Sequence, residues 1–358
     1  MTLLHWLSAS APSLSGALSR GVPTLSKLPL SASYPFTGHQ PALTALERRT
    51  IPSREDVVEF FKTHERVSWN LTEMLEIEPD EIDLDALTDT DIYVVESTML
   101  VESNNPDYVA NLLKYFEADQ DACDFIMMWA VEEWKHYYAL RDYLAKAQTA
   151  LQLRRAQAVG EGGSVERIRD LVEAALSEQV GDVREASAEN WGIPLHYMPV
   201  QVVASTTLQE FVTAEFYRNH ARHTKEPVLA KLELLLAKDE TRHEMFYEKK
   251  MRDVLDDEPE LMPRVIDALK EFGMPGAYLV DAYDDRKAAM EQAAFPTVSG
   301  RRAAFSRLFG KLERMLGRDN AMTVLVDGNY LADGSESSRK KRPSAALISR
   351  LITARIAG

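Results

Sequence analysis

The sequence predicts an all-α protein, organised as a helical bundle with additional helices. Three observations predict this class. Apolar residues recur at the helical period of 3.6 in many long segments, no segment shows the sustained alternation of a half-buried strand, and two close pairs of long helices stand out. With 358 residues, 45% of them hydrophobic, the chain is long enough to bury a substantial core.

Capping and breaking residues mark the ends of several of these helices. Ser53 precedes acidic residues and is a suitable N-cap for the first helix. Gly192 and Pro194 interrupt the helical pattern in a loop at residues 190–199, and Pro227 suits the first position of a helix. The predicted helices, in chain order, cover residues 53–64, 90–117, 120–148, 164–187, 199–222, 227–254, 258–272, 299–316 and 319–331.

Composition divides the chain into an N-terminal arm (1–50), a single helical domain (51–333) and a basic C-terminal tail (334–358). The first 46 residues are rich in Ser, Leu, Ala and Pro and contain no Asp or Glu. Organelle transit peptides and disordered bacterial arms share this composition. We therefore expect a cytoplasmic protein if the source is bacterial, and a protein of the plastid stroma if the arm is a transit peptide.

The C-terminal tail carries four consecutive basic residues, Arg339 to Arg342, followed by interleaved apolar residues and arginines. Two interpretations remain open for it. A flexible solubilising tail is one, and a basic amphipathic helix that binds a membrane surface or an acidic partner is the other.

Charge and cysteine content exclude several classes of protein. The net charge of −15 argues against a general nucleic-acid binder. The single cysteine, Cys123, rules out both an intramolecular disulfide and a cysteine-based zinc site. No run of eighteen apolar residues occurs, so we predict no transmembrane helix.

Two Glu-x-x-His motifs, Glu133/His136 and Glu240/His243, lie on predicted helices. Residues three apart share one face of a helix, so each pair can bind the same metal ion. Both pairs continue the apolar stripe of their helix and are therefore expected to point inward, whereas Glu132 falls outside the stripe and is expected to reach water.

Each motif also has a partner glutamate on the preceding helix. Glu102 precedes Glu133 by 31 residues, and Glu210 precedes Glu240 by 30. Two helical hairpins would thus bring four carboxylates and two imidazoles into one core. Two divalent cations would balance the four negative charges, and this oxygen-rich set suits iron or manganese. The alternative is a set of structural charges satisfied by one another.

Pro106 follows Glu102 by four residues and removes a helical hydrogen bond to the carbonyl of that residue. Two consequences are open: a simple kink, or a helix opened beside the metal so that oxygen or substrate can approach.

At these residues the chain resembles the soluble acyl-(acyl-carrier-protein) desaturases. The likeness is carried by "MLVESNNPDYVANLL", "AVEEWKHYYALRDYL", "LQEFVTAEFYRNHAR" and "AKDETRHEMFYEKKM". The resemblance implies a ferritin-like four-helix core with flanking helices and a centre of two iron ions (Fe2+). The metal ligands that it implies are Glu102, Glu133, His136, Glu210, Glu240 and His243.

Three further site residues follow from the resemblance. Thr213 matches a threonine near the oxygen-binding side and could relay a proton, the alternative being a threonine bonded back to its own helix. Asp239 would orient a ligand histidine. Trp69 is a candidate for an electron path with Asp239, the alternative being an ordinary core tryptophan.

The implied activity is the O2-dependent desaturation of a long fatty acyl chain carried by acyl carrier protein. Two electrons would come from ferredoxin or a similar reductant, because the chain carries no flavin or nicotinamide fingerprint. A homodimer is expected. Basic segments at "RNHARHTK" and "EKKMR", at the ends of two ligand helices, are candidates for binding the acidic carrier protein, the alternative being ordinary solvated helix faces.

Three other functions compete with this one. A hydroxylase or N-oxygenase could use the same ligands to insert oxygen. A ribonucleotide reductase small subunit would need a radical tyrosine four residues after the first motif histidine, where this chain has Leu140. A non-enzymatic ferritin-like iron store would be expected in a shorter chain that forms cages.

Overall fold

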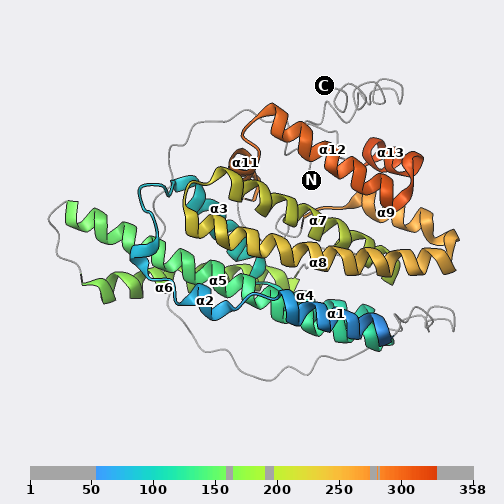
Figure 1. Cartoon of the computed structure of the whole chain (residues 1–358), viewed down its shortest axis with the longest axis horizontal. Helices are drawn as coiled ribbons and strands as arrows, with labels where there is room; N and C mark the ends of the chain where they lie inside the picture. The colour runs from blue at the N-terminus through green and yellow to red at the C-terminus, as the bar shows by residue number, and fades with distance from the viewer. Residues whose placement is uncertain (1–53, 159–163, 190–196, 275–279, 281–282, 329–358) are drawn as a thin grey trace.

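The computed structural model describes residues 54–158, 164–189, 197–274, 280 and 283–328 (Figure 1). Within these residues every regular element is a helix, which confirms the all-α class. The N-terminal arm, the basic tail and most of the predicted loop at 190–199 lie outside the described residues.

Four long helices form the ferritin-like core. They are α3 (Asp89–Glu102), α5 (Gln120–Ala158), α7 (Pro199–His223) and α8 (Pro227–Asp257). A short connection joins α7 to α8, and the two pack along one another as an antiparallel pair (Figure 1). Helix α3 packs against α5, and α5 in turn contacts α8.

The remaining helices surround this core. The flanking helices are α1 (Arg54–Val67), α2 (Leu71–Leu75), α4 (Asn105–Tyr115), α6 (Val165–Glu189), α9 (Met262–Glu271), α11 (Tyr283–Ala294), α12 (Val298–Leu316) and α13 (Arg318–Asp327), with 3-10 turns at Pro79–Glu81 and Pro259–Leu261. The sequence did not predict α2 or α11. Among the described helices, none combines the length and the apolar character needed to cross a bilayer.

The single helix predicted over 90–117 is wrong, because the chain breaks directly after Glu102 into α3 and α4. Pro106 lies in the first turn of α4, where its missing N–H costs nothing. The Ser103 hydroxyl and the Asn104 side chain both donate to the carbonyl of Leu100, at 2.7 and 3.3 Å, and so satisfy the end of α3. Helix α5, by contrast, runs ten residues beyond its predicted end at 148.

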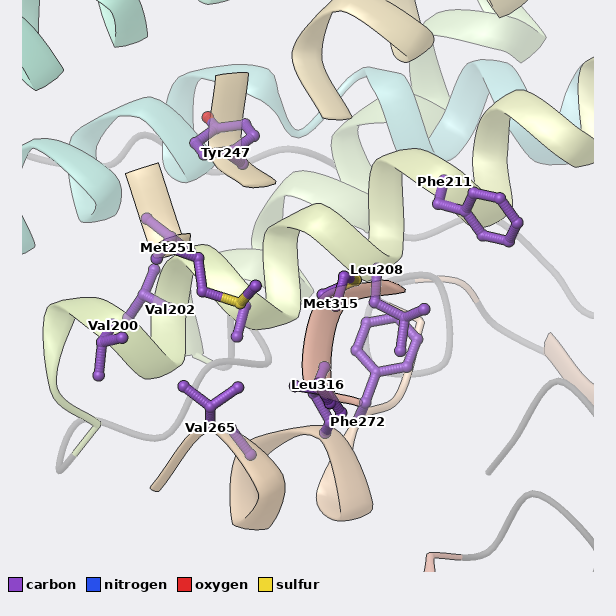
Figure 2. Close-up of a cluster of buried hydrophobic side chains, with 14 of the residues drawn as sticks. Val200, Val202, Leu208, Phe211, Tyr247, Met251, Val265, Phe272, Met315 and Leu316 are labelled. Atoms are coloured by element: carbon purple, nitrogen blue, oxygen red, sulfur yellow. The ribbon is translucent and has the colours of Figure 1, made fainter. Parts of the chain in front are cut away.

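Two apolar clusters enclose the middle of the core. One fills the space between α7, α8, α9 and α12, where Val202, Leu208, Met251, Val265 and Leu316 are all buried (Figure 2). The other lies between α3, α5 and the first half of α8. These two clusters therefore shield the polar groups in the centre of the bundle from water.

A buried charge cluster fixes one end of the bundle. His220 of α7 lies between two carboxylates, with its Nε2 3.2 Å from Asp91 of α3 and its Nδ1 2.6 Å from Glu233 of α8. Burial opposes the charge of the imidazole, but these two carboxylates raise the pKa of His220 to about 9. The imidazolium therefore links three of the four core helices.

This cluster predicts a loss of stability at alkaline pH. Because the folded pKa of His220 exceeds the unfolded value, its stabilisation is complete below about pH 6.5 and disappears as the pH rises through 9, a change on the order of 3 kcal/mol. Urea unfolding should therefore show a lower free energy of unfolding at pH 9 than at pH 6. In His220→Gln this decline should be largely absent. Equal declines in the wild type and the variant would contradict the assignment.

Candidate metal centre

The six motif residues come together in the middle of the bundle, each from the helix on which its spacing placed it. They form two groups whose ligand atoms lie within 4.8 Å of one another and whose members are all buried. The first group comprises Glu102, Glu133, His136 and Glu240; the second comprises Glu133, Glu210, Glu240 and His243. The two groups share Glu133 and Glu240. Two overlapping groups of this kind could hold two cations.

Four atoms around the centre are buried and form no well-aligned hydrogen bond: Glu133 Oε1, Glu210 Oε1, His136 Nδ1 and His243 Nδ1. The shortest contact among them joins His243 Nδ1 to Glu133 Oε1 at 3.1 Å. Buried polar atoms usually have good hydrogen-bond partners, and a group of such atoms around one point is compatible with a bound cation. A ligand set of carboxylate oxygens with one imidazole nitrogen for each cation suits iron or manganese. The residues present therefore fit a two-metal centre.

Electrostatics favour the same conclusion. Burial, together with the charges of Glu133 and Glu240, raises the pKa of Glu102 well above its ordinary value. Burial and the carboxylate of Glu240 do the same to the pKa of Glu210. Burial alone would lower the pKa of His136, but neighbouring carboxylates, Glu133 foremost, hold that pKa well above its usual range. Without cations the centre therefore has to retain protons, and bound cations would replace them.

One histidine is oriented by the aspartate that the sequence singled out. His136 Nε2 lies 3.2 Å from Asp239 Oδ2, which leaves Nδ1 facing the centre. The Trp69 indole donates to the same oxygen at 2.7 Å, and the Lys135 ammonium lies 4.5 Å from the centroid of that indole. The structure thus brings Trp69 and Asp239 together as expected, and Trp69 is half-buried rather than a core residue.

Glu132 orients the other histidine, and its predicted exposure is wrong. Its side chain is fully buried, and its Oε2 lies 2.8 Å from His243 Nε2. Arg242 bridges the two orienting carboxylates, donating to Glu132 at 2.5 Å and to Asp239 at 2.6 Å. His64 of α1 places its Nδ1 2.6 Å from Glu132. The helical stripe could not reveal this role, because the groups that bury Glu132 come from α1 and α8.

Tyr217 is a further residue that the sequence did not mark. Its hydroxyl donates to Glu102 Oε1 at 2.8 Å, and its side chain is buried. It lies seven residues after Glu210, on the same face of α7, and this spacing was the only available signal. This hydrogen bond holds the carboxylate of Glu102, the most exposed member of the first group, in position.

A cavity opens on the carboxylate side of the centre. Its empty volume, which includes space open to solvent, is about 700 Å3. Four glutamates of the centre line it, and most of the other lining residues are apolar, with Val101, Val212, Phe216, Met274 and Met290 among them. Thr213 lines the same cavity while its hydroxyl donates to the Gln209 carbonyl at 3.0 Å.

Comparison with known proteins identifies the family. The model of the fatty acid desaturase family matches residues 72–300, which include all six buried motif residues and most of the described helices. Comparison with curated proteins gives no match. The match covers well over half of the chain, and the chain therefore belongs to the fatty acid desaturase family.

Proposed function

We propose that this chain is a di-iron acyl-(acyl-carrier-protein) desaturase that introduces a double bond into a long fatty acyl chain. The observation that carries the proposal is the pair of overlapping Glu/His groups beside an apolar cavity. In the balanced reaction, an acyl CH2–CH2 unit and O2, with two electrons and two protons, give a CH=CH unit and two waters. Two iron ions bound by these residues would supply the activation of O2 that removes hydrogen from unactivated carbon.

The proposed work of the ligand residues is to hold the ions together through redox changes. Glu133 and Glu240 belong to both groups and would help to hold both ions, while Glu102 and Glu210 would each help to hold one. Asp239 and Glu132 keep the two imidazoles turned so that Nδ1 faces the centre. Arg242 offsets the charge of both orienting carboxylates.

The cavity would hold the acyl chain and exclude water from it. Apolar side chains line most of its surface, and four glutamates of the centre line it as well, so an extended hydrocarbon in the cavity would lie close to the centre. Thr213 lies on this lining one helical turn beyond Glu210. Its hydroxyl, now donating to the Gln209 carbonyl, would have to rotate to deliver a proton to the reacting side.

Electrons would enter from the opposite side of the centre. Trp69 is half-buried and hydrogen-bonded to Asp239, which contacts His136, so these three residues connect the protein surface with the ligand set. A ferredoxin or similar protein is the proposed donor. The Lys135 cation over the indole would stabilise electron density on the ring face.

The acidic carrier protein would dock at the C-terminal end of α7. Arg222, His223 and Lys225 are exposed there. The other basic segment, near the end of α8, is a weaker candidate because Lys249 pairs with Asp253 and Lys250 is buried against Asp119. The two segments lie at opposite ends of the antiparallel pair, so a single carrier protein would not cover both (Figure 1).

Iron content tests the ligand assignment. Glu133→Gln keeps the size of the side chain but removes a charge common to both groups, so it should lose both ions. His136→Gln and His243→Gln should each lose one. The matched control is Glu291→Gln, which alters a buried glutamate of α11 outside both groups. The measurement is the iron content of the folded proteins. A Glu133→Gln protein that binds as much iron as the wild type would exclude Glu133 as a ligand of both ions.

Product mass tests the reaction. The iron-loaded protein is incubated with stearoyl- and palmitoyl-acyl carrier protein, reduced ferredoxin and O2. We expect the acyl group to lose two hydrogens. Gain of one oxygen would instead identify a hydroxylase, and an unchanged acyl group with O2 consumed would mean that the substrate is different.

Replacement of Trp69 tests the electron path. Trp69→Phe keeps an aromatic ring but removes the N–H that donates to Asp239. We expect iron to remain bound while reduction by ferredoxin slows by roughly tenfold or more. The control is Trp134→Phe, which alters a partly exposed tryptophan of α5 that stacks on Tyr138. An unchanged reduction rate in Trp69→Phe would remove Trp69 from the path.

A further inference from the structure

Two buried tyrosines lie close to the candidate metal centre and differ in one contact. Tyr217 of α7 and Tyr247 of α8 are each 1% exposed, and Tyr247 lies one helical turn beyond His243. The Tyr217 hydroxyl donates to Glu102 Oε1 at 2.8 Å. Among the described residues, the Tyr247 hydroxyl has no hydrogen-bond partner. The two side chains thus allow the effect of one hydroxyl to be separated from that of a buried aromatic ring.

Glu102 and Glu210 each belong to only one of the two ligand groups, and their helices support them differently. Glu102 is the last residue of α3, where the carbonyl groups lack the partners that a continuing helix provides. Glu210 lies in the interior of α7, with several turns on either side. Glu102 is also the more exposed residue, at 8% against 2% for Glu210. The backbone therefore holds Glu102 less firmly than Glu210.

Both of these carboxylates line the cavity, so each has free space beside it into which it could turn. The hydrogen bond from Tyr217 opposes such a turn at Glu102. At Glu210, Oε1 forms no well-aligned hydrogen bond with any described residue. Each ligand histidine, by contrast, contacts a carboxylate outside the groups, either Asp239 or Glu132. Within the described part of the chain, the Tyr217 hydroxyl is therefore a contact of the first group that has no counterpart in the second.

We propose that Tyr217 is a positioning residue for one cation only, the cation of the first group, which contains Glu102. This inference rests on the proposed two-metal centre. A hydrogen bond to a charged carboxylate is stronger than one between neutral groups, and loss of such a partner typically lowers metal affinity by roughly 10- to 100-fold. The phenol fixes the direction of the Glu102 carboxylate, for which the end of α3 gives little support.

Helix α7 would then serve both cation positions. Glu210 supplies a carboxylate to the second group, and Tyr217, two turns further along the same face, secures a carboxylate of the first. A change at Tyr217 should therefore weaken the binding of one ion and leave the other unaffected. A general loosening of the bundle would weaken the binding of both.

Titration of the metal-free, full-length chain with Co2+ tests this role without any turnover, because N/O sites bind Co2+ at least as tightly as Fe2+. Equilibrium dialysis and the visible absorption of bound Co2+ give the two affinities. The wild type should bind two ions. Tyr217→Phe should bind one ion as the wild type does and the other roughly 10- to 100-fold more weakly.

The matched control is Tyr247→Phe, which removes a hydroxyl that has no hydrogen-bond partner among the described residues. It should bind both ions as the wild type does. Circular dichroism verifies that the two variants are folded.

Histidine variants identify the ion that depends on Tyr217. His136→Gln disables the first group, so adding Tyr217→Phe to it should leave the affinity for the remaining ion unchanged. His243→Gln disables the second group, and there the same addition should weaken the remaining ion by roughly 10- to 100-fold.

Equal affinities in the wild type and Tyr217→Phe would overturn this inference alone. So would an equal loss of affinity for both ions in Tyr217→Phe, or a similar loss in Tyr247→Phe. A wild type that binds no Co2+ would overturn the inference together with the two-metal centre.

Discussion

The concentration of carboxylates at the centre of the bundle is the constraint on which the rest of the structure depends. Four glutamates and two histidines lie where the flanking helices have excluded water. Burial raises the pKa of Glu102 and Glu210, so this group is stable as anions only with positive charge among them. Metal binding and the packing of the helices are therefore two aspects of one energetic problem.

The centre was predictable because its geometry is local. A Glu-x-x-His pair lies on one helix face whatever surrounds it, and the apolar stripe determines that this face points inward. The repetition of the pattern, with Glu102 and Glu210 each about thirty residues upstream of a motif, then fixes which helices must meet. Long helices with these periodic stripes leave few alternatives to a four-helix core.

The residues that orient the ligands were harder to predict because distant segments create their environment. Glu132 lies outside the stripe of α5, and only α1 and α8, through His64 and Arg242, convert that position into a buried one. The break after Glu102 likewise depends on side chains of Ser103 and Asn104 that turn back to α3, which hydrophobic periodicity does not register. The local sequence pattern predicts the direction in which a side chain points from its helix. Whether a residue outside the apolar stripe is buried depends on the tertiary fold.

Helix α5 shows why a strongly mixed sequence can still form a core helix. Glu133 and His136 face the candidate metal centre, Glu132 contacts His243, and Lys135 lies over Trp69. Each charged residue thus meets a partner of opposite charge, a neighbouring polar group or an aromatic face, so no charge is buried alone. The remaining face of α5 carries Met127, Val131 and Tyr138, which are largely exposed. A helix whose polar side chains are satisfied inside the protein can thus leave apolar side chains on its outer face.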